Sequence, residues 1–99
     1  MSVKLKVKTS KFDVAEFIKT EEDMEGYLNA AIAENSPTLL VAALNDIARI
    51  KSINKIAENI KVNRQGLYKN LNGKSKISFE TIYKVVDSLG FKFSIVSKA

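Results

Sequence analysis

The sequence contains neither cysteine nor histidine among its 99 residues. Without cysteine the chain can form no disulfide, no thiolate metal site and no thiol nucleophile. Without histidine it lacks the commonest general base and metal ligand. Glycine-rich phosphate loops and the GxSxG nucleophile motif are absent as well. These absences argue against an enzyme, and we expect a binding protein that uses no cofactor, metal or small-molecule substrate.

Long apolar stretches are also missing. No run of about 20 apolar residues is present, so we expect no membrane span. Residues 1–11 are basic, but no continuous apolar stretch or cleavage site follows them, which argues against a signal peptide and for a cytoplasmic protein. The 45% apolar and 27% charged residues are typical of a folded chain. We expect a basic tail or short strand over residues 1–11 and a single domain over residues 12–99.

Charge is distributed unevenly along the chain, whose formal net charge is +5. Residues 12–50 contain eight acids and two cations, whereas residues 51–76 contain seven cations and one acid. A folded block with a charge of +6 is typical of a surface that binds a polyanion. A solvated basic surface would explain the charge equally well, although the acidic block argues against uniform non-specific binding.

Apolar residues recur at helical spacing in five segments, and most of these segments follow a residue that caps helices well. The predicted helices cover residues 21–34, 37–50, 53–60, 64–71 and 79–89, after Thr20, Ser36, Ser52, Asn63 and Ser78. Phe79, Ile82, Tyr83, Val86 and Leu89 form the predicted inner stripe of the last helix, and Gly90 ends it.

The two ends of the chain show other patterns. A short helix is predicted between Phe12 and Ile18, with Phe12, Ala15 and Phe17 facing inward. Apolar and polar residues alternate over residues 91–96 and over residues 3–7, which indicates strands that pair within one chain or between two. The predicted fold class is therefore all-α, a compact five-helix domain with short terminal β-strands.

Residues 53–71 place two short helices around the three-residue turn Lys61-Val62-Asn63. Ala57 allows close approach of the second helix, Val62 fills the turn, and Leu67 holds the second helix to the core. This pattern is typical of a helix-turn-helix, whose second helix enters the DNA major groove.

The outer surface of the second helix and the loop after it carry the candidate DNA-binding residues. Arginine can bridge guanine, asparagine and glutamine can bridge adenine, and lysines suit phosphates. The candidates are Asn63, Arg64, Gln65, Gly66, Tyr68, Lys69, Asn70, Lys74 and Lys76. Asn63 also fits a simple helix cap, Arg64 and Gln65 fit ordinary exposed helix formers, and Tyr68 fits a packed aromatic.

Several segments together resemble a known family. They are Ala43–Arg49, Ile56-Ala57, Asn63–Tyr68 and Phe79–Ile82, with Phe12-Asp13, Glu21–Asp23, Tyr27–Ala31 and Pro37 upstream. In order and spacing they resemble the addiction-module antidote proteins, HigA-like antitoxins with a helix-turn-helix of the lambda-repressor (Xre) type. The resemblance covers roughly residues 11–96.

The resemblance implies an antitoxin that neutralises a RelE/HigB-like ribonuclease toxin encoded beside it. It also implies binding to double-stranded DNA at the promoter of its own operon, which it represses, commonly as a homodimer. Arg64, Leu67 and Tyr68 match the family directly, and Asn63 occupies the usual serine cap position. Lys61 stands where such turns usually have glycine, so either Lys61 adopts a positive φ or the turn differs.

Two other functions remain open at this point. The chain could be a stand-alone Xre-type transcriptional regulator without a toxin partner. It could also be a protein-interaction adaptor that uses the same fold, because fold alone does not determine function.

Overall fold

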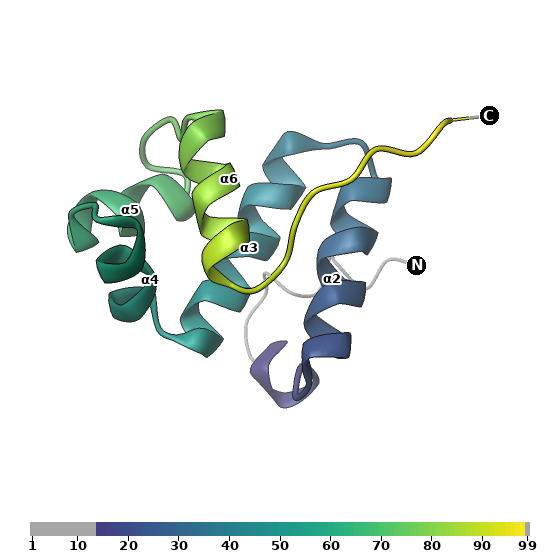
Figure 1. Cartoon of the computed structure of the whole chain (residues 1–99), viewed down its shortest axis with the longest axis horizontal. Coiled ribbons are helices and arrows are strands. Elements are labelled where there is room, and N and C mark those ends of the chain that lie inside the picture. The colour runs from purple at the N-terminus through teal and green to yellow at the C-terminus, as the bar shows by residue number, and fades with distance from the viewer. Residues whose placement is uncertain (1–13, 99) are drawn as a thin grey trace.

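The computed structural model describes residues 14–98. It contains a 3₁₀ turn and five α-helices (Figure 1). Their bounds are η1 Val14–Glu16, α2 Glu21–Ala33, α3 Pro37–Lys51, α4 Ile53–Ile60, α5 Arg64–Leu71 and α6 Phe79–Ser88. All five predicted helices are therefore present, with ends that differ by at most one residue from those predicted. The predicted tail or strand over residues 1–11, and Phe12, lie outside the described residues.

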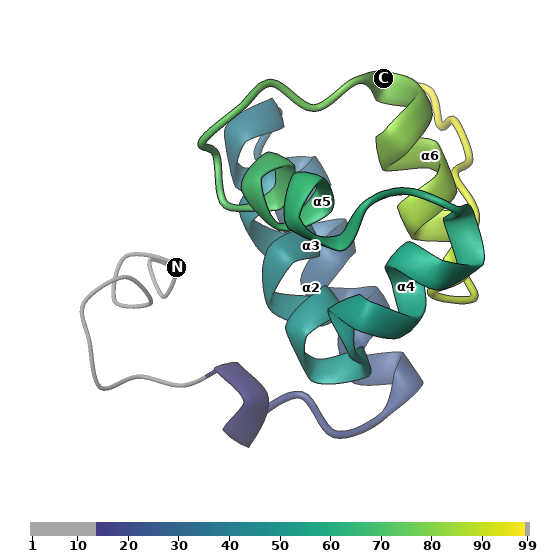
Figure 2. The same ribbon diagram turned by 90° about the vertical axis from the view of Figure 1, so that its left-hand side faces the viewer.

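Helix α3 occupies the centre of the fold. It packs against η1 and against each of the other four helices, and Figures 1 and 2 show the others arranged around it. Leu44, Ile47 and Ala48 on α3 are completely buried. Around them lie the other core side chains, which are apolar and come from every element: Val14, Ile18, Met24, Leu28, Ala43, Ile56, Ala57, Leu67, Leu71, Val85, Val86 and Leu89.

The first long helix begins at a capping box. The Thr20 hydroxyl accepts a hydrogen bond from the Asp23 amide at 3.0 Å, and the Asp23 carboxylate accepts one from the Thr20 amide at 3.1 Å. The same carboxylate accepts a second backbone hydrogen bond from Lys19 at 2.9 Å. These backbone donors hold the pKa of Asp23 below its ordinary value of 3.8. Asp23 in the first turn therefore has a structural role.

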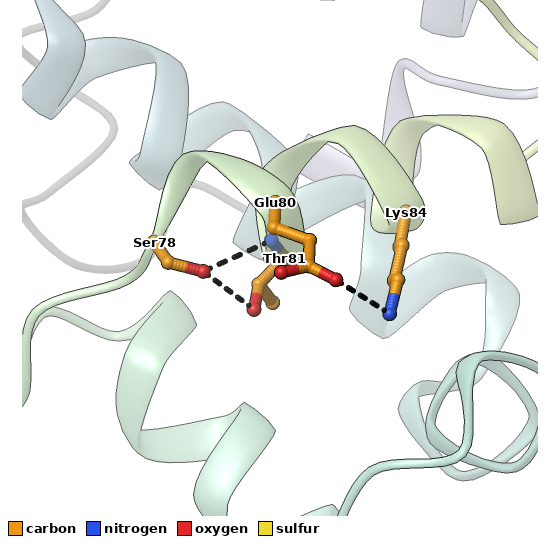
Figure 3. Close-up of polar contacts among 4 residues, drawn as sticks. All are labelled: Ser78, Glu80, Thr81 and Lys84. Atoms are coloured by element: carbon orange, nitrogen blue, oxygen red, sulfur yellow. Dashed lines mark hydrogen bonds and ion pairs between the residues drawn. The ribbon is translucent and has the colours of Figure 1, made fainter.

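Helix α6 is also capped at its start by a hydroxyl side chain (Figure 3). The Ser78 hydroxyl accepts a hydrogen bond from the Thr81 amide at 3.1 Å and donates one to the Thr81 hydroxyl at 3.0 Å. One turn later, Lys84 forms an ion pair with Glu80 at 3.1 Å. Local side chains thus fix where α6 begins.

A single residue, Ser52, joins α3 to α4. Its amide donates to the Ala48 carbonyl at 2.8 Å, which closes α3, and its hydroxyl accepts from the Lys55 amide at 3.4 Å, which opens α4. The backbone of Ser52 has φ 100° and ψ 106°, a positive φ that is uncommon outside glycine. The serine tolerates this conformation because it caps two helices at once.

The prediction of a C-terminal strand is wrong within the described residues. Residues 91–98 contain no strand, and no other strand exists in residues 14–98 to pair with them. A strand requires hydrogen bonds to a neighbour, and alternation of side chains alone does not supply one. The corresponding strand predicted near Val3 lies outside the described residues.

Some inner faces were also predicted wrongly. Near the start of the chain Val14 and Ile18 are buried, whereas Ala15 and Phe17 are exposed, because the segment forms a 3₁₀ turn rather than a full helix. In the turn between α4 and α5, Val62 is 38% exposed and does not fill the core.

The predicted inner stripe of α6 is confirmed at three positions, since Val86 and Leu89 are buried and Ile82 packs against the core, and it is wrong at two. Val85 is completely buried, although it was not predicted to face inward, and Phe79 and Tyr83 are exposed. The helix is turned so that Val85, Val86 and Leu89 contact the core, which leaves its two aromatic side chains on the surface.

Candidate nucleic-acid interface

The turn between α4 and α5 is closed by backbone hydrogen bonds. The Val62 amide donates to the Ala57 carbonyl at 3.0 Å, and the Lys61 amide donates to the Glu58 carbonyl at 3.2 Å. This pair of bonds is a Schellman motif, which requires a left-handed residue at its turning point. Lys61 occupies that point with φ 58° and ψ 49°. Of the two alternatives predicted for Lys61, the structure therefore shows the positive φ, the conformation that glycine adopts most readily.

Helix α5 begins immediately after this turn. The Asn63 side-chain oxygen accepts a hydrogen bond from the Gly66 amide at 3.0 Å, so Asn63 is the N-cap. Asn63 itself is exposed. The cap interpretation of Asn63 is confirmed. The capping bond uses the side-chain oxygen of Asn63, and its side-chain nitrogen forms no hydrogen bond to any residue that the structure describes.

Two leucines hold α5 to the rest of the molecule. Leu67 and Leu71 are each 1% exposed and lie in the core beside α3 and α4. Positions 65 and 69 lie on the opposite side of a helix whose inner face carries positions 67 and 71, and Gln65 and Lys69 are exposed as the sequence pattern predicts. Arg64 is exposed at the first position of the helix, although its position is on the side of Leu67 and Leu71, and Tyr68 is 51% exposed at the edge.

Gly66 lies on the same outer surface. A Cβ atom added to Gly66 would meet only Asn63 atoms, at 3.9 Å, which is ordinary van der Waals contact. Nothing inside the described molecule therefore requires glycine at this position. Its absent side chain leaves the backbone of α5 open to close approach from outside.

A shallow hollow between the start of α4 and the outer face of α5 brings in a residue that the sequence analysis missed. The hollow is lined by Ile53, Asn54, Arg64, Gln65 and Tyr68. Asn54 is exposed in the first turn of α4, and it lines the same hollow as Arg64, Gln65 and Tyr68 of α5. The available signal was a polar, bifunctional residue at the start of the first helix of the pair.

The loop after α5 is tied back onto the end of that helix. The Lys74 and Ser75 amides donate to the Lys69 carbonyl at 2.9 and 3.3 Å. The Ser75 hydroxyl donates to the Asn70 side-chain oxygen at 2.7 Å. Asn70 is half-buried and turned toward this loop, unlike the other candidate residues on α5. Lys74 and Lys76 are exposed on a loop with a defined path.

The cations of this region are largely without ion-pair partners. Lys51 forms an ion pair with Glu21 at 3.2 Å, and no other lysine or arginine of residues 51–76 has an acidic partner among the residues that the structure describes. Those cations include Arg64, Lys69, Lys74 and Lys76. An exposed surface that keeps its positive charge uncompensated attracts polyanions.

Sequence comparisons identify the family to which the chain belongs. Residues 8–97 match the family described as "probable addiction module antidote protein". The chain belongs to this antidote family. It is also 39% identical over 84 residues to an uncharacterized protein of Haemophilus influenzae, a match that covers 85% of this chain and 87% of that protein. No solved structure matches the chain. An antidote acts against a toxin, so membership of the antidote family implies a toxin partner in general terms.

The antidote-family chain carries a second charged surface on α2 and α3. Glu22 and Glu25 are exposed and adjacent on α2, next to Glu21. On α3, Asp46 accepts a hydrogen bond from the Tyr27 hydroxyl at 2.6 Å and lies 3.8 Å from Arg49. Burial, together with this carboxylate, raises the pKa of Tyr27 well above its usual range, so the hydroxyl stays protonated as a donor.

Two further classes of site find no support in the residues described. In residues 14–98, no cluster of acidic, histidine or cysteine side chains is arranged to bind a metal ion. No helix in this part of the antidote-family chain is long and apolar enough to cross a membrane.

Proposed function

We propose that the chain is the antitoxin of a type II toxin–antitoxin module that represses its own operon by sequence-specific binding to double-stranded DNA. In this proposal α4, the turn and α5 form a helix-turn-helix of the lambda-repressor (Xre) type, as in HigA-like antitoxins. The observation that carries the proposal is the outer surface of α5, where exposed amide and cationic side chains without ion-pair partners stand on a helix anchored by Leu67 and Leu71.

Helix α5 is the recognition helix in this proposal. Arg64 in its first turn suits the O6 and N7 atoms of guanine, and Gln65 suits the N6 and N7 atoms of adenine. The open surface at Gly66 lets the backbone approach the DNA closely. Asn63 adds a free amide nitrogen at the N-terminus of the same helix.

The remaining candidates hold the protein on the DNA backbone. Lys69, Lys74 and Lys76 are exposed cations that suit phosphates. Tyr68 offers a hydroxyl at the edge of the hollow that Asn54 lines. Asn70 contributes through the loop that it ties down, because its side-chain oxygen accepts the bond from Ser75. Two copies would read half-sites about 34 Å apart, one helical turn of DNA.

The acidic surface of α2 is the proposed contact for a RelE/HigB-like toxin. A ribonuclease that binds RNA needs a basic surface, and Glu22 and Glu25 offer exposed negative charge to it. Glu21 lies beside them and also pairs with Lys51. Reversing the charge of Glu21, Glu22 and Glu25 should abolish neutralisation in a co-expression growth assay.

Asp87→Lys, which reverses an exposed acid on α6, is the matched control and should still neutralise the toxin. Normal growth rescue by the triple charge reversal would reject the toxin-binding surface.

The DNA-binding proposal is tested by titrating the protein against the DNA upstream of its own gene and against random DNA, at two salt concentrations. We expect tighter binding to the upstream DNA and a steep loss of affinity with salt for both, because lysine contacts release counterions. Equal, weak binding to both DNAs would reject sequence-specific repression and favour a protein-interaction adaptor. Tight, specific binding with no toxin gene next to the antitoxin gene would favour a stand-alone regulator.

A further inference from the structure

The hydrophobic core extends to the surface in the hollow between α4 and α5. On the inner face of α4, Ile56 and Ala57 are each 3% exposed. Ile53 lies one turn earlier on the same face and also packs against the core, but it is only partly buried. The uncovered part of Ile53 matters because this residue lines the hollow. A group that enters the hollow therefore meets an aliphatic side chain.

The other residues that line the hollow carry polar groups. They are an arginine, two side-chain amides and a tyrosine, all of them exposed: Asn54, Arg64, Gln65 and Tyr68. The hollow has a volume of about 480 Å³, so it can admit the edge of a base pair without displacing a side chain. Ile53 is the one aliphatic residue among the five. A well-matched ligand therefore presents polar groups and an apolar group side by side.

DNA offers one apolar group of this kind at the base edges of its major groove. It is the 5-methyl group of thymine, which 5-methylcytosine also carries. Every other group along those edges is a hydrogen-bond donor or acceptor, and the backbone presents charged phosphates. Placing any of these against Ile53 would remove its water without replacing the hydrogen bond, which costs free energy. A pyrimidine 5-methyl group is therefore the part of DNA that Ile53 can contact favourably.

We propose that Ile53 is a specificity-determining residue that recognises the 5-methyl group of the thymine whose partner adenine Gln65 contacts. The inference rests on the proposed function, since it takes α5 as the recognition helix. Across the major groove an A·T pair presents adenine N7 and N6, then thymine O4, then the methyl group. Gln65 suits the first two groups, and Ile53 lines the same hollow from α4 and suits the last.

Asn54 supplies a donor for the group that remains on this edge. It follows Ile53 in the first turn of α4, is exposed and lines the hollow. Its side-chain nitrogen can donate a hydrogen bond to thymine O4. One A·T pair is then read from two helices, the adenine by α5 and the thymine by α4. Because Arg64 and Gln65 are consecutive and line one hollow, this pair lies next to the G·C pair that Arg64 contacts.

Uracil substitution tests the methyl contact directly. In duplexes of the upstream DNA, each thymine of the bound site is replaced in turn by uracil, which removes the methyl group alone. One position in each half-site should weaken binding by wild-type protein about fourfold, the loss expected for one buried methyl group. With Ile53→Ala, the thymine and uracil duplexes should bind equally well at that position. Fluorescence anisotropy measures all four combinations of protein and duplex.

Ile60→Ala is the matched control. Ile53 is the first residue of α4 and Ile60 the last, and both are partly buried against the core. The two substitutions remove the same atoms from the same helix, but Ile60 does not line the hollow. Ile60→Ala should therefore keep the fourfold preference for thymine. If Ile53→Ala does not fold, Ile53→Val replaces it, and its preference for thymine should lie between those of wild type and no preference.

Cytosine at the sensitive position separates the methyl group from the A·T pair. A C·G pair there should bind more weakly than the T·A pair, because the contacts of Gln65 and Asn54 are lost. Methylating that cytosine at C5 should restore about fourfold of the loss with wild-type protein and nothing with Ile53→Ala. An equal gain with both proteins would show that the methyl group acts through the shape of the DNA and would overturn the inference.

The inference and the proposed function fail in different ways. If upstream DNA is bound specifically but no uracil substitution weakens binding, or if Ile53→Ala keeps the thymine preference, the inference is wrong and the proposed function stands. Ile53 is then only an edge of the core. Equal binding of upstream and random DNA by the wild-type protein would reject the proposed function, and the inference with it.

Discussion

The two charged halves of the fold use their side chains in opposite ways. On α2, Asp23 closes the capping box, and Glu21 forms an ion pair with Lys51. On α3, Asp46 accepts a hydrogen bond from the Tyr27 hydroxyl. On α5 and the loop after it, Arg64 and Lys69 have no acidic partner among the described residues. Acids in the first half thus stabilise the structure locally, whereas cations in the second half contribute little to internal contacts. Charge without an internal partner is the better guide to a binding surface.

The largest expected effect is on DNA affinity, at Arg64. Arg64→Ala should weaken operator binding by about 1–3 kcal/mol and relax specificity at one base pair, because bidentate guanine contacts are lost. Lys74→Ala and Lys76→Ala should instead weaken all DNA sequences alike and reduce the salt slope by about one unit each. Binding measured by fluorescence anisotropy on operator and random DNA distinguishes the two. Equal losses on both DNAs for Arg64→Ala would contradict its assigned role.

A substitution at Gly66 should have opposite effects on folding stability and on operator affinity. Gly66→Ala should stabilise α5 by about 1 kcal/mol, because alanine favours helices and the added Cβ meets nothing closer than 3.9 Å. The same methyl group should weaken operator binding, since it would stand between the backbone and the DNA. Urea unfolding and DNA titration of one sample measure both effects. Unchanged operator affinity would mean that the DNA does not approach α5 at this position.

The turn at Lys61 offers a smaller gain. Lys61→Gly should raise the free energy of unfolding by about 0.5–1 kcal/mol, because glycine adopts the left-handed conformation without the Cβ penalty. Lys55→Gly, in the first half of α4, should lower it by about 1 kcal/mol. Thermal or urea unfolding measures both. A loss of stability in Lys61→Gly would show that the lysine side chain stabilises the turn in a way that its backbone conformation does not explain.

The smallest effect expected is a pH dependence from Asp23. The pKa of Asp23 is lower in the folded state than in the unfolded state, so its contribution is fully present above the ordinary pKa of 3.8 and is lost as the pH falls through the folded value. Unfolding free energies measured below pH 4 should therefore fall less steeply for Asp23→Asn than for wild type. Identical slopes for the two proteins would show that the capping box contributes no pH dependence.

Local chemistry made most of the helices predictable from the sequence. Thr20, Ser36, Asn63 and Ser78 all cap helices where expected, and each accepts a hydrogen bond from an amide three residues later. The outward position of Gln65 and Lys69 also follows from the inward position of Leu67 and Leu71. Such features depend on residues close in sequence, so a single chain is sufficient to read them.

The errors arose where tertiary contacts decide. Val85 rather than Tyr83 faces the core, because α3 and α4 set the rotation of α6 and local periodicity allowed either choice. Residues 91–96 alternate like a strand, but pairing depends on a neighbour that the described chain does not supply. Asn54 could not be identified from the sequence, because its place beside the α5 side chains depends on how the fold packs the start of α4 against α5.

The junction at Ser52 constrains how this architecture can vary. Because Ser52 both ends α3 and starts α4, no linker residues separate the two helices, and an inserted residue could not be accommodated without moving one of them. An insertion there would rotate α4 and α5 together relative to α2 and α3. It would therefore change the orientation of the exposed cations on α5 relative to the exposed acids on α2. Relatives of different length should therefore vary in the segment between α5 and α6 and keep a one-residue joint between α3 and α4.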